Sequence, residues 1–344
     1  MGNTAITTQK TERDSSLELL RIVAMLMIIA HHFACHGGFY FHANSIMLNR
    51  LWHKFIFMGG SLGNDIFVML SGYFLINSKV LNLRRLFNLW ARIFFYSVII
   101  YSLFLTVGHE KLSLKTALDV LMPLTRNYNR QWWFASIYLM MYLVHPYINR
   151  LIHTFTREEY RKFLILIGLC WCVIPALTNS DFGANNTINF VCLYCFAGYV
   201  RLYADDFRNR NYILCGAALI GINFLSAYVL DTLGQHHNYF FGMMGPFTVL
   251  AALCLLIGFR NLNIKYHKDI NTIASATFGV YLIHDNIFVR PFIWLEFFRN
   301  ASFQNSPYLI PYSLAVILIV YSSCTILELL RSKIFKTLTR GYLS

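Results

Sequence analysis

Ten apolar runs recur along the chain and are separated by short polar segments. A helix needs about 20 mostly apolar residues to cross a lipid bilayer, and several of the runs reach that length. The series therefore predicts an all-α, polytopic integral membrane helix bundle of about ten transmembrane helices. The predicted spans are 17–35, 55–77, 86–107, 132–152, 163–178, 187–203, 212–231, 243–259, 272–290 and 308–330.

The composition excludes the main soluble alternatives. Of the 344 residues, 57% are hydrophobic and 13% are charged, which is about half the ~25% charged content of soluble domains. A soluble domain of this composition would expose apolar patches that aggregate, and a disordered chain is far less hydrophobic. We expect one transmembrane domain over residues 1–344 and no separate soluble domain. Residues 1–16 are polar and do not resemble a cleavable signal peptide, so we expect a cytoplasmic N-terminus.

The net charge of +13 is distributed unevenly between the two sides of the predicted bundle. Of the 29 basic residues, 19 fall on the side that holds both termini and 8 on the other side. Because cytoplasmic loops are enriched in Lys and Arg, both termini are predicted to be cytoplasmic. This asymmetry removes the need for a nucleic-acid partner. Arg21 and Arg92 are the two remaining cations, in or at the spans.

The first span carries an arginine and a histidine on one helical face. Ser15 and Glu18 fit a capping box, with Ser15 as N-cap. Arg21 and His32 are eleven residues apart, so a helix brings them within about 20° of one another and ~16 Å apart along its axis. Ionisable residues in spans usually face the bundle interior. The alternative is that Arg21 reaches the headgroups and His32 ends the helix at the outer interface.

These residues resemble motifs of a known family. Glu18 to Arg21, with His32 after ten further residues, is similar to the R-x10-H signature of the membrane acyltransferase 3 family. Residues 63–75 resemble its G-V-D-L-F-F-V-L-S-G-F-L segment, and residues 278–284 resemble its Y-G-I-Y-L-I-H segment. Trp133 and Phe134 are similar to a recurrent W-F pair. The motifs occur in the same order over most of the chain.

The resemblance implies a multi-pass protein of the bacterial inner membrane. Such proteins transfer acyl groups, mostly acetyl, from cytosolic acyl-CoA to hydroxyls of cell-surface or lipid-linked glycans. It implies acetyl-CoA as a substrate with no tightly bound cofactor, and membrane lipid and a glycan acceptor as partners; a homo-oligomer is left open. No metal is assigned, because the outer histidines show no fixed i, i+4 spacing. They are His36, His42, His236 and His237.

Acyl transfer needs a base, oxyanion donors and a thioester held nearby. We expect neutral His32 to be the base, with a covalent acyl-His intermediate as the rival role. Arg21 would bind the anionic phosphates of CoA, with help from Arg84, Arg85 and Arg92. The family often carries an R-x-x-R pair where the loop after the second span enters the third. If Arg92 is the second arginine, the first would be at position 89, which is Leu, so only Arg92 fits the pair well.

Asp65 is a third candidate catalytic residue with several readings. It could hold the His32 ring, pair with Arg92 or a loop arginine, or lie at a helix start near Gly63. Ser71 and Gly72 favour close helix packing, and Trp132 and Trp133 favour an interfacial position. The acceptor-binding or supporting candidates are Glu18, His31, Ser71, Trp133, Tyr281 and His284.

A polytopic transporter or flippase for a glycan precursor or small polar solute is the competing function. Carriers often contain paired half-repeats with broken helices in both halves. The glycines at 59–60 and the segment 242–246 do not lie at corresponding positions. The sequence therefore favours the enzyme.

Overall fold

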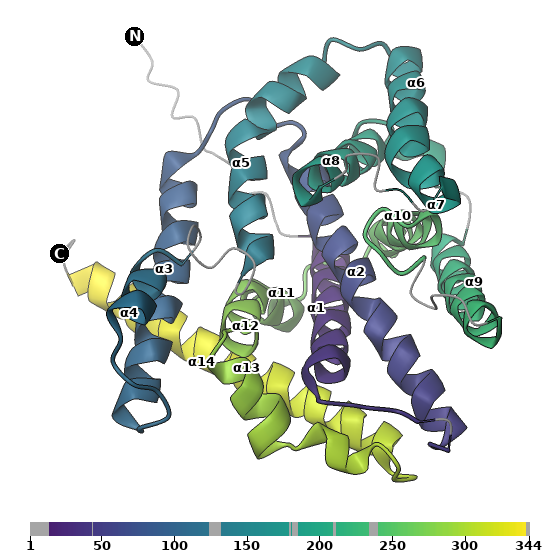
Figure 1. The fold of residues 1–344 in the computed structure, drawn as a ribbon. Coiled ribbons are helices and arrows are strands. Elements are labelled where there is room, and N and C mark those ends of the chain that lie inside the picture. Colours follow the sequence, from purple (N-terminus) through teal and green to yellow (C-terminus); the bar gives the residue numbers. More distant parts are fainter. Residues whose placement is uncertain are drawn as a thin grey trace.

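The computed structural model describes residues 14–42, 44–123, 132–178, 180, 185–208, 211–233 and 240–341. Every secondary-structure element in these ranges is helical, as predicted (Figure 1). The elements are α1 (Ser15–His36), α2 (Met47–Leu75), α3 (Leu83–Thr106), α4 (Leu114–Leu121), α5 (Trp133–Ile152), α6 (Arg157–Gly168), η1 (Leu169–Val173), α7 (Ile174–Thr178), α8 (Asn186–Leu202), η2 (Ala204–Phe207), α9 (Tyr212–Thr232), α10 (Pro246–Asn261), α11 (Lys268–Ser275), α12 (Thr277–His284), α13 (Val289–Pro291), η3 (Phe292–Phe297), η4 (Asn300–Phe303) and α14 (Leu309–Gly341).

Six helical segments are long and apolar enough to cross a membrane. They are α1, α2, α3, the continuous run from α6 to α7, α9 and α14. The predicted spans at 132–152, 187–203, 243–259 and 272–290 coincide with α5, α8, α10 and the α11–α12 pair, which do not meet the same criteria. A multi-pass helical membrane protein is therefore supported, while the count of ten and the cytoplasmic termini stay predictions. Residues 1–13 and the histidines at 236 and 237 lie outside the described residues.

Three helix boundaries differ from the apolar runs. The predicted span 272–290 is interrupted at Ala276 and its last helix ends at His284, so Asp285 and Arg290 lie beyond α12. Helix α14 continues to Gly341, past the predicted end at residue 330. Polar residues end an apolar run without ending a helix, because Lys, Arg and Glu are good helix formers.

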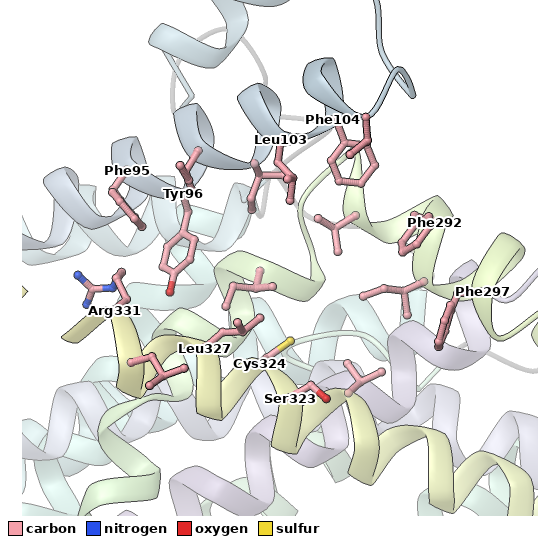
Figure 2. Close-up of a pocket in the computed structure, with 18 of the residues that line it drawn as sticks. Phe95, Tyr96, Leu103, Phe104, Phe292, Phe297, Ser323, Cys324, Leu327 and Arg331 are labelled. Atoms are coloured by element: carbon pink, nitrogen blue, oxygen red, sulfur yellow. The ribbon is translucent and has the colours of Figure 1, made fainter. Parts of the chain in front are cut away.

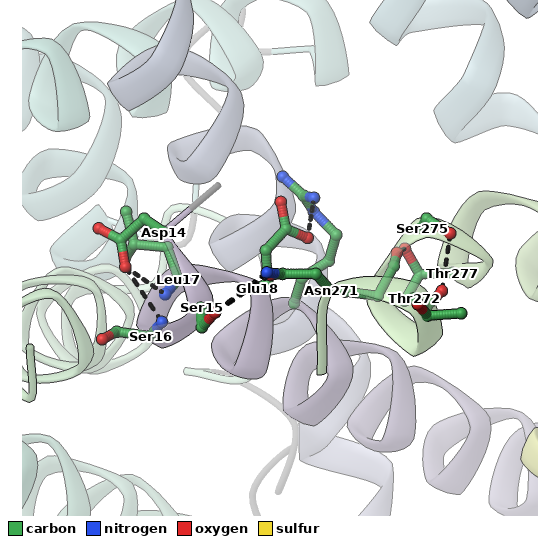
Figure 3. A network of polar contacts seen from close by, with 11 residues as sticks. Asp14, Ser15, Ser16, Leu17, Glu18, Asn271, Thr272, Ser275 and Thr277 are labelled. Atoms are coloured by element: carbon green, nitrogen blue, oxygen red, sulfur yellow. Dashed lines mark hydrogen bonds and ion pairs between the residues drawn. The ribbon is translucent and has the colours of Figure 1, made fainter. Parts of the chain in front are cut away.

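The N-terminus of α1 is capped differently from the prediction. Asp14 is the N-cap, and its carboxylate accepts hydrogen bonds from the amides of Ser16 and Leu17. The predicted Ser15 cap is therefore wrong. The Ser15 hydroxyl instead bonds the Asn271 side chain of α11 (Figure 3). It also accepts a hydrogen bond from the amide of His267. These contacts attach the first turn of α1 to the segment before α11.

Helix α1 lies in the middle of the bundle, between α2 and the α11–α12 pair, and α14 passes across its far end (Figure 1). It packs closely on α2 at Gly59, Gly60 and Gly63. A Cβ at Gly63 would lie 2.7 Å from the carbonyl oxygen of Ala24, and one at Gly60 would lie 2.4 Å from the His31 ring. Small residues of this kind let helix backbones approach in membranes. The contact fixes the depth of α1 relative to α2.

A buried tryptophan directly precedes helix α5. Trp132 has φ 55° and is fully buried, so the predicted interfacial position is wrong for this residue. Its indole packs in the core that α1, α3, α12 and α14 share. Trp133 is partly buried and its ring contacts Phe134 and Phe190. The start of α5 is thereby brought into the bundle interior.

Candidate active site

His32 is hydrogen-bonded to a second histidine from the other end of the chain. Its Nδ1 lies 2.9 Å from Nε2 of His284, which stands at the last position of α12. Nδ1 of His284 lies 2.6 Å from the carbonyl oxygen of Val280. His284 is fully buried and the His32 side chain is 13% exposed. The structure thus joins a base candidate and a supporting candidate that the sequence placed 252 positions apart.

The direction of these hydrogen bonds follows from the backbone carbonyl of Val280, which contacts His284. A carbonyl oxygen can only accept, so Nδ1 of His284 donates to Val280. Neutral His284 then has an acceptor at Nε2, and Nδ1 of His32 donates to it. Nε2 of a neutral His32 is therefore left with its lone pair. Fixing one ring nitrogen by the hydrogen bond of the other is how proteins select a histidine tautomer.

A carboxylate lies beside that lone pair. Oδ1 of Asp285 is 3.7 Å from Nε2 of His32, within reach of an ion pair if His32 takes up a proton. Asp285 is buried, and Arg290 contacts the same oxygen at 2.9 Å and donates to the Asp285 carbonyl. The arrangement can stabilise an imidazolium on His32 while Arg290 holds the carboxylate in place.

Three of the predicted arginines line one cavity of about 330 Å³ near the first turns of α1. Arg21, Arg85 and Arg92 come from α1 and α3, and Ser71 of α2 and Ser275 of α11 lie in the same wall. Arg21 is also paired with Glu18 at 2.5 Å. Clustered guanidinium groups suit phosphates, which they bind with several donors at once. The cavity lies at the end of α1 that the loop charges assign to the cytosol.

Arg92 belongs to a buried network that the sequence analysis did not anticipate. Glu328 of α14 lies 3.6 Å from Arg92 and accepts two hydrogen bonds of 2.7 Å from Arg331. The Tyr96 hydroxyl also donates to it, at 2.5 Å. Two arginines share this one carboxylate, so the network keeps an excess positive charge beside the cavity.

An aromatic layer separates the arginine cavity from the histidine pair. Phe67 and Phe134 line the cavity, and their rings are 6.3 Å apart. The ring of Tyr281 lies beyond them, 6.1 Å from Phe134 and 6.5 Å from His284. Its buried hydroxyl lies beside the amides of Phe134 and Ala135 at the start of α5 and near Asp285. The Tyr281 hydroxyl and these two amides are thus hydrogen-bond donors that lie between the arginine cavity and the His32–His284 pair.

A larger cavity of about 990 Å³ has a different character (Figure 2). It lies between α3, α14 and η3, and its wall is almost entirely apolar, with Leu103, Phe104 and Phe292 among the lining residues. Such a wall fits hydrocarbon and offers little to phosphates. The smaller arginine cavity is therefore the better place for a polyanionic ligand.

Asp65 does not take any of the positions predicted for it. Helix α2 is continuous from Met47 to Leu75, so Asp65 is not at a helix start. Its carboxylate is fully buried beside the backbone of Met244, and it has no hydrogen bond to His32 or Arg92 within the described residues. The reason is helical geometry: Gly63 faces α1, and two residues further on the chain has turned about 200°.

Three other predicted residues have contacts away from His32 Nε2 or lie at the arginine end of α1. His31 donates from Nδ1 to the carbonyl oxygen of Phe57 and holds α1 on α2. Ser71 donates to the carbonyl oxygen of Phe67 in its own helix. Arg84 is exposed on the first turn of α3 and is not among the residues that line the arginine cavity.

The sequence analysis missed Asp285, Arg290 and Glu328 as site residues. A signal was present for two of them, because Asp285 follows His284 directly and Glu328 is a carboxylate inside the last apolar run. Ionisable residues at such positions are costly and need a partner. Periodicity could not reveal which partner each one finds.

The sequence model of the acyltransferase domain family matches residues 14–328. Searches of the curated proteins and of the solved structures each found no match. The family match covers the residues of this site from Glu18 to Glu328 and leaves out Arg331, and it agrees with the resemblance of the R-x10-H and Y-L-I-H motifs. With nearly the whole chain matched, the protein belongs to the acyltransferase 3 family and is a membrane acyltransferase.

Proposed function

We propose that this acyltransferase moves an acetyl group from cytosolic acetyl-CoA to a hydroxyl of a cell-surface or lipid-linked glycan in the bacterial inner membrane. The observation that carries the proposal is the bonding of His32, whose Nδ1 is engaged by His284 and whose Nε2 keeps its lone pair. A base with this geometry on the same helix as Arg21 fits transfer between two sides of a membrane.

The donor would bind through its phosphates. Arg21, Arg85 and Arg92 would hold the anionic part of CoA at the cavity of about 330 Å³, and the thioester arm would extend along α1 toward His32. We leave Arg84 out of the donor site because its side chain lies outside that cavity. Acetyl-CoA is a substrate in this scheme, and no tightly bound cofactor takes part.

The chemical step transfers one proton and one acyl group. Nε2 of His32 takes the proton of the acceptor hydroxyl as its oxygen attacks the thioester carbonyl. The bond from carbonyl carbon to sulfur then breaks, and the CoA thiolate leaves with the proton returned by His32. Asp285 stabilises the transient imidazolium, at the 3.7 Å separation of the resting structure. The buried Tyr281 hydroxyl, near Asp285, would donate a hydrogen bond to the oxyanion.

Purified full-length protein would be incubated with radiolabelled acetyl-CoA and a membrane glycan fraction. Label should pass to glycan in the wild type, and His32→Ala should lower kcat by roughly 10²–10⁴-fold, the usual contribution of general acid–base groups. The exposed His267 serves as a matched control, and His267→Ala should retain activity. Full activity of His32→Ala would overturn the assignment.

A second pair of variants tests the donor site. Arg21→Ala should raise the KM for acetyl-CoA, whereas Arg84→Ala should leave it unchanged, because Arg21 lines the cavity and Arg84 does not. Equal effects of both variants would contradict the placement of the donor. Movement of an unmodified glycan across vesicles, with no label transferred, would instead favour a flippase.

A further inference from the structure

The outer end of α1 gathers an unusual number of imidazoles. The rings of His32 and His36 are 5.2 Å apart, those of His32 and His284 are 5.0 Å apart, and those of His31 and His32 are 5.6 Å apart. His36 makes no part of the acyl-transfer scheme. Four imidazoles in one place, with a carboxylate beside them, raise the question of a metal.

Three of these groups have the geometry of a ligand set. The ligand atoms of His32, His36 and Asp285 all lie within 4.8 Å of one another. His32 and His36 are four positions apart on α1, which places them one turn apart on the same face. The i, i+4 partner of His36 is thus His32, which lies one turn deeper in α1.

We propose that His32, His36 and Asp285 form a binding site for Zn²⁺ and that the bound ion blocks acyl transfer. Imidazole nitrogen and carboxylate oxygen are common zinc ligands, and three protein ligands with a fourth position for water make a usual zinc environment. Ligand atoms around tetrahedral zinc lie roughly 3.3 Å apart, so side-chain movements of about 1 Å would close the set. The imidazoles favour zinc over magnesium or calcium.

The hydrogen bonds of the resting structure already prepare one ligand. His284 holds Nδ1 of His32, so the lone pair of Nε2 points to the side where Asp285 lies, at 3.7 Å. A metal-bound histidine usually donates its other ring nitrogen to a fixed acceptor in this way. His284 therefore acts as the outer partner that orients His32 toward the ion.

Arg290 competes with the ion for Asp285. Its guanidinium lies 2.9 Å from the same Asp285 oxygen that faces His32. Zinc can bind only when the Arg290–Asp285 contact breaks, because the positive guanidinium of Arg290 repels a Zn²⁺ ion at the same carboxylate. Removal of the Arg290 charge should therefore strengthen zinc binding.

The inhibitory half of the proposal rests on the proposed function. Zinc would take the Nε2 lone pair of His32, which is the same lone pair that removes the proton of the acceptor hydroxyl. Zinc binding itself does not depend on that role. The two statements can therefore fail separately.

Binding would be measured on the full-length protein without a polyhistidine tag, by competition between ZnCl₂ and a chromogenic chelator. His36→Ala should weaken zinc binding at least about tenfold, since even outer partners of metal ligands are worth 10–100-fold. His42→Ala is the matched control, because His42 is exposed and lies outside the ligand set, and its zinc affinity should equal that of the wild type. Excess MgCl₂ should not compete. Equal zinc affinity of His36→Ala and wild type would overturn the site.

Arg290→Gln guards against a folding artefact, because it should raise zinc affinity and a misfolded protein would not. A lower affinity in this variant would contradict the site. In the transfer assay, ZnCl₂ should inhibit the wild type at lower concentration than it inhibits His36→Ala. If zinc binds through His36 and transfer continues unchanged, the inhibitory role is overturned. If the wild type transfers no label at all but the binding differences hold, the proposed function fails and the zinc site stands.

Discussion

Gly279 of α12 lies directly against the buried carboxylate of Glu328 on α14. A Cβ at Gly279 would be 2.4 Å from the Glu328 carboxyl carbon. This contact gives a physical reason for the glycine in the Phe278–Gly279–Val280 motif. The glycine leaves room for the carboxylate that Arg92, Arg331 and Tyr96 share.

Gly279→Ala should therefore displace the Glu328 carboxylate and loosen Arg92. Loss of a hydrogen bond to a buried charged group costs about 1.5–3 kcal/mol, so we expect a lower Tm and a higher KM for acetyl-CoA. Gly221→Ala is the control, because a Cβ there would meet nothing within 4 Å. If both variants melt and bind donor alike, the close contact does not matter.

The 2.9 Å contact of His284 with Nδ1 of His32 makes His284 a positioning residue under the proposed function. His284→Phe removes the acceptor for Nδ1 of His32, so the imidazole can adopt the tautomer with its proton on Nε2. We expect kcat to fall by roughly 10²–10⁴-fold, while the KM for acetyl-CoA changes little because the arginine cavity is untouched. Steady-state kinetics in detergent would separate the two parameters. An effect confined to KM would contradict the role.

Tyr281→Phe tests the donor between the two ends of the site. The variant keeps the ring contacts with Phe134 and His284 and loses only the hydroxyl beside Asp285. We expect kcat to fall by roughly 10²–10³-fold, the cost of one oxyanion donor, with protein levels in membranes unchanged. Tyr101 is also a buried tyrosine, and Tyr101→Phe should keep full activity. Unchanged kcat in Tyr281→Phe would exclude the donor role.

Ser71→Ala should have little effect, although Ser71 lines the arginine cavity. Its hydroxyl is engaged with the carbonyl oxygen of Phe67 one turn earlier, and such bonds contribute little to helix stability. We expect kcat and KM within about fivefold of the wild type, since the free energy of a neutral hydrogen bond is about 1 kcal/mol. A larger loss would mean that Ser71 contacts a substrate.

Asn149 connects three elements at the end of α2. Its amide donates to the carbonyl oxygens of Leu75 and Ser78, and its oxygen accepts from the Tyr194 hydroxyl of α8. Asn149→Ala leaves these buried groups without that partner, at a cost of about 1–3 kcal/mol for each unsatisfied group. Thermal unfolding in detergent should show a clear loss of Tm, with the exposed Asn44→Ala as control. An unchanged Tm would mean that water replaces the amide.

The helical character of the chain and the face of α1 could be predicted because they depend on local spacing. Apolar length and the eleven-residue separation of Arg21 and His32 are properties of one helix. The partners of these residues depend on contacts between distant segments. Asp285 and Glu328 take the places beside His32 and Arg92 that Asp65 was expected to fill, and only the packing of α12 and α14 on α1 and α3 decides between them.

The caps illustrate the same difference on a smaller scale. Asp14 and Ser15 are both good N-cap residues, so the sequence alone could not choose between them. The structure uses the Asp14 carboxylate for the helix and the Ser15 hydroxyl for Asn271. A tertiary contact more than 250 positions away thus decides a boundary that looks local.

Because Arg21 and His32 stand on one uninterrupted helix, the proposed function makes that helix set the distance between the donor phosphates and the base. Inserting one residue between them would rotate His32 by about 100° and lengthen the gap by about 1.5 Å. The imidazole would then leave His284 even though every side chain is still present. Under the proposed function, the rise of α1 would set the distance that the thioester arm has to span, and such an insertion should abolish activity although both side chains remain.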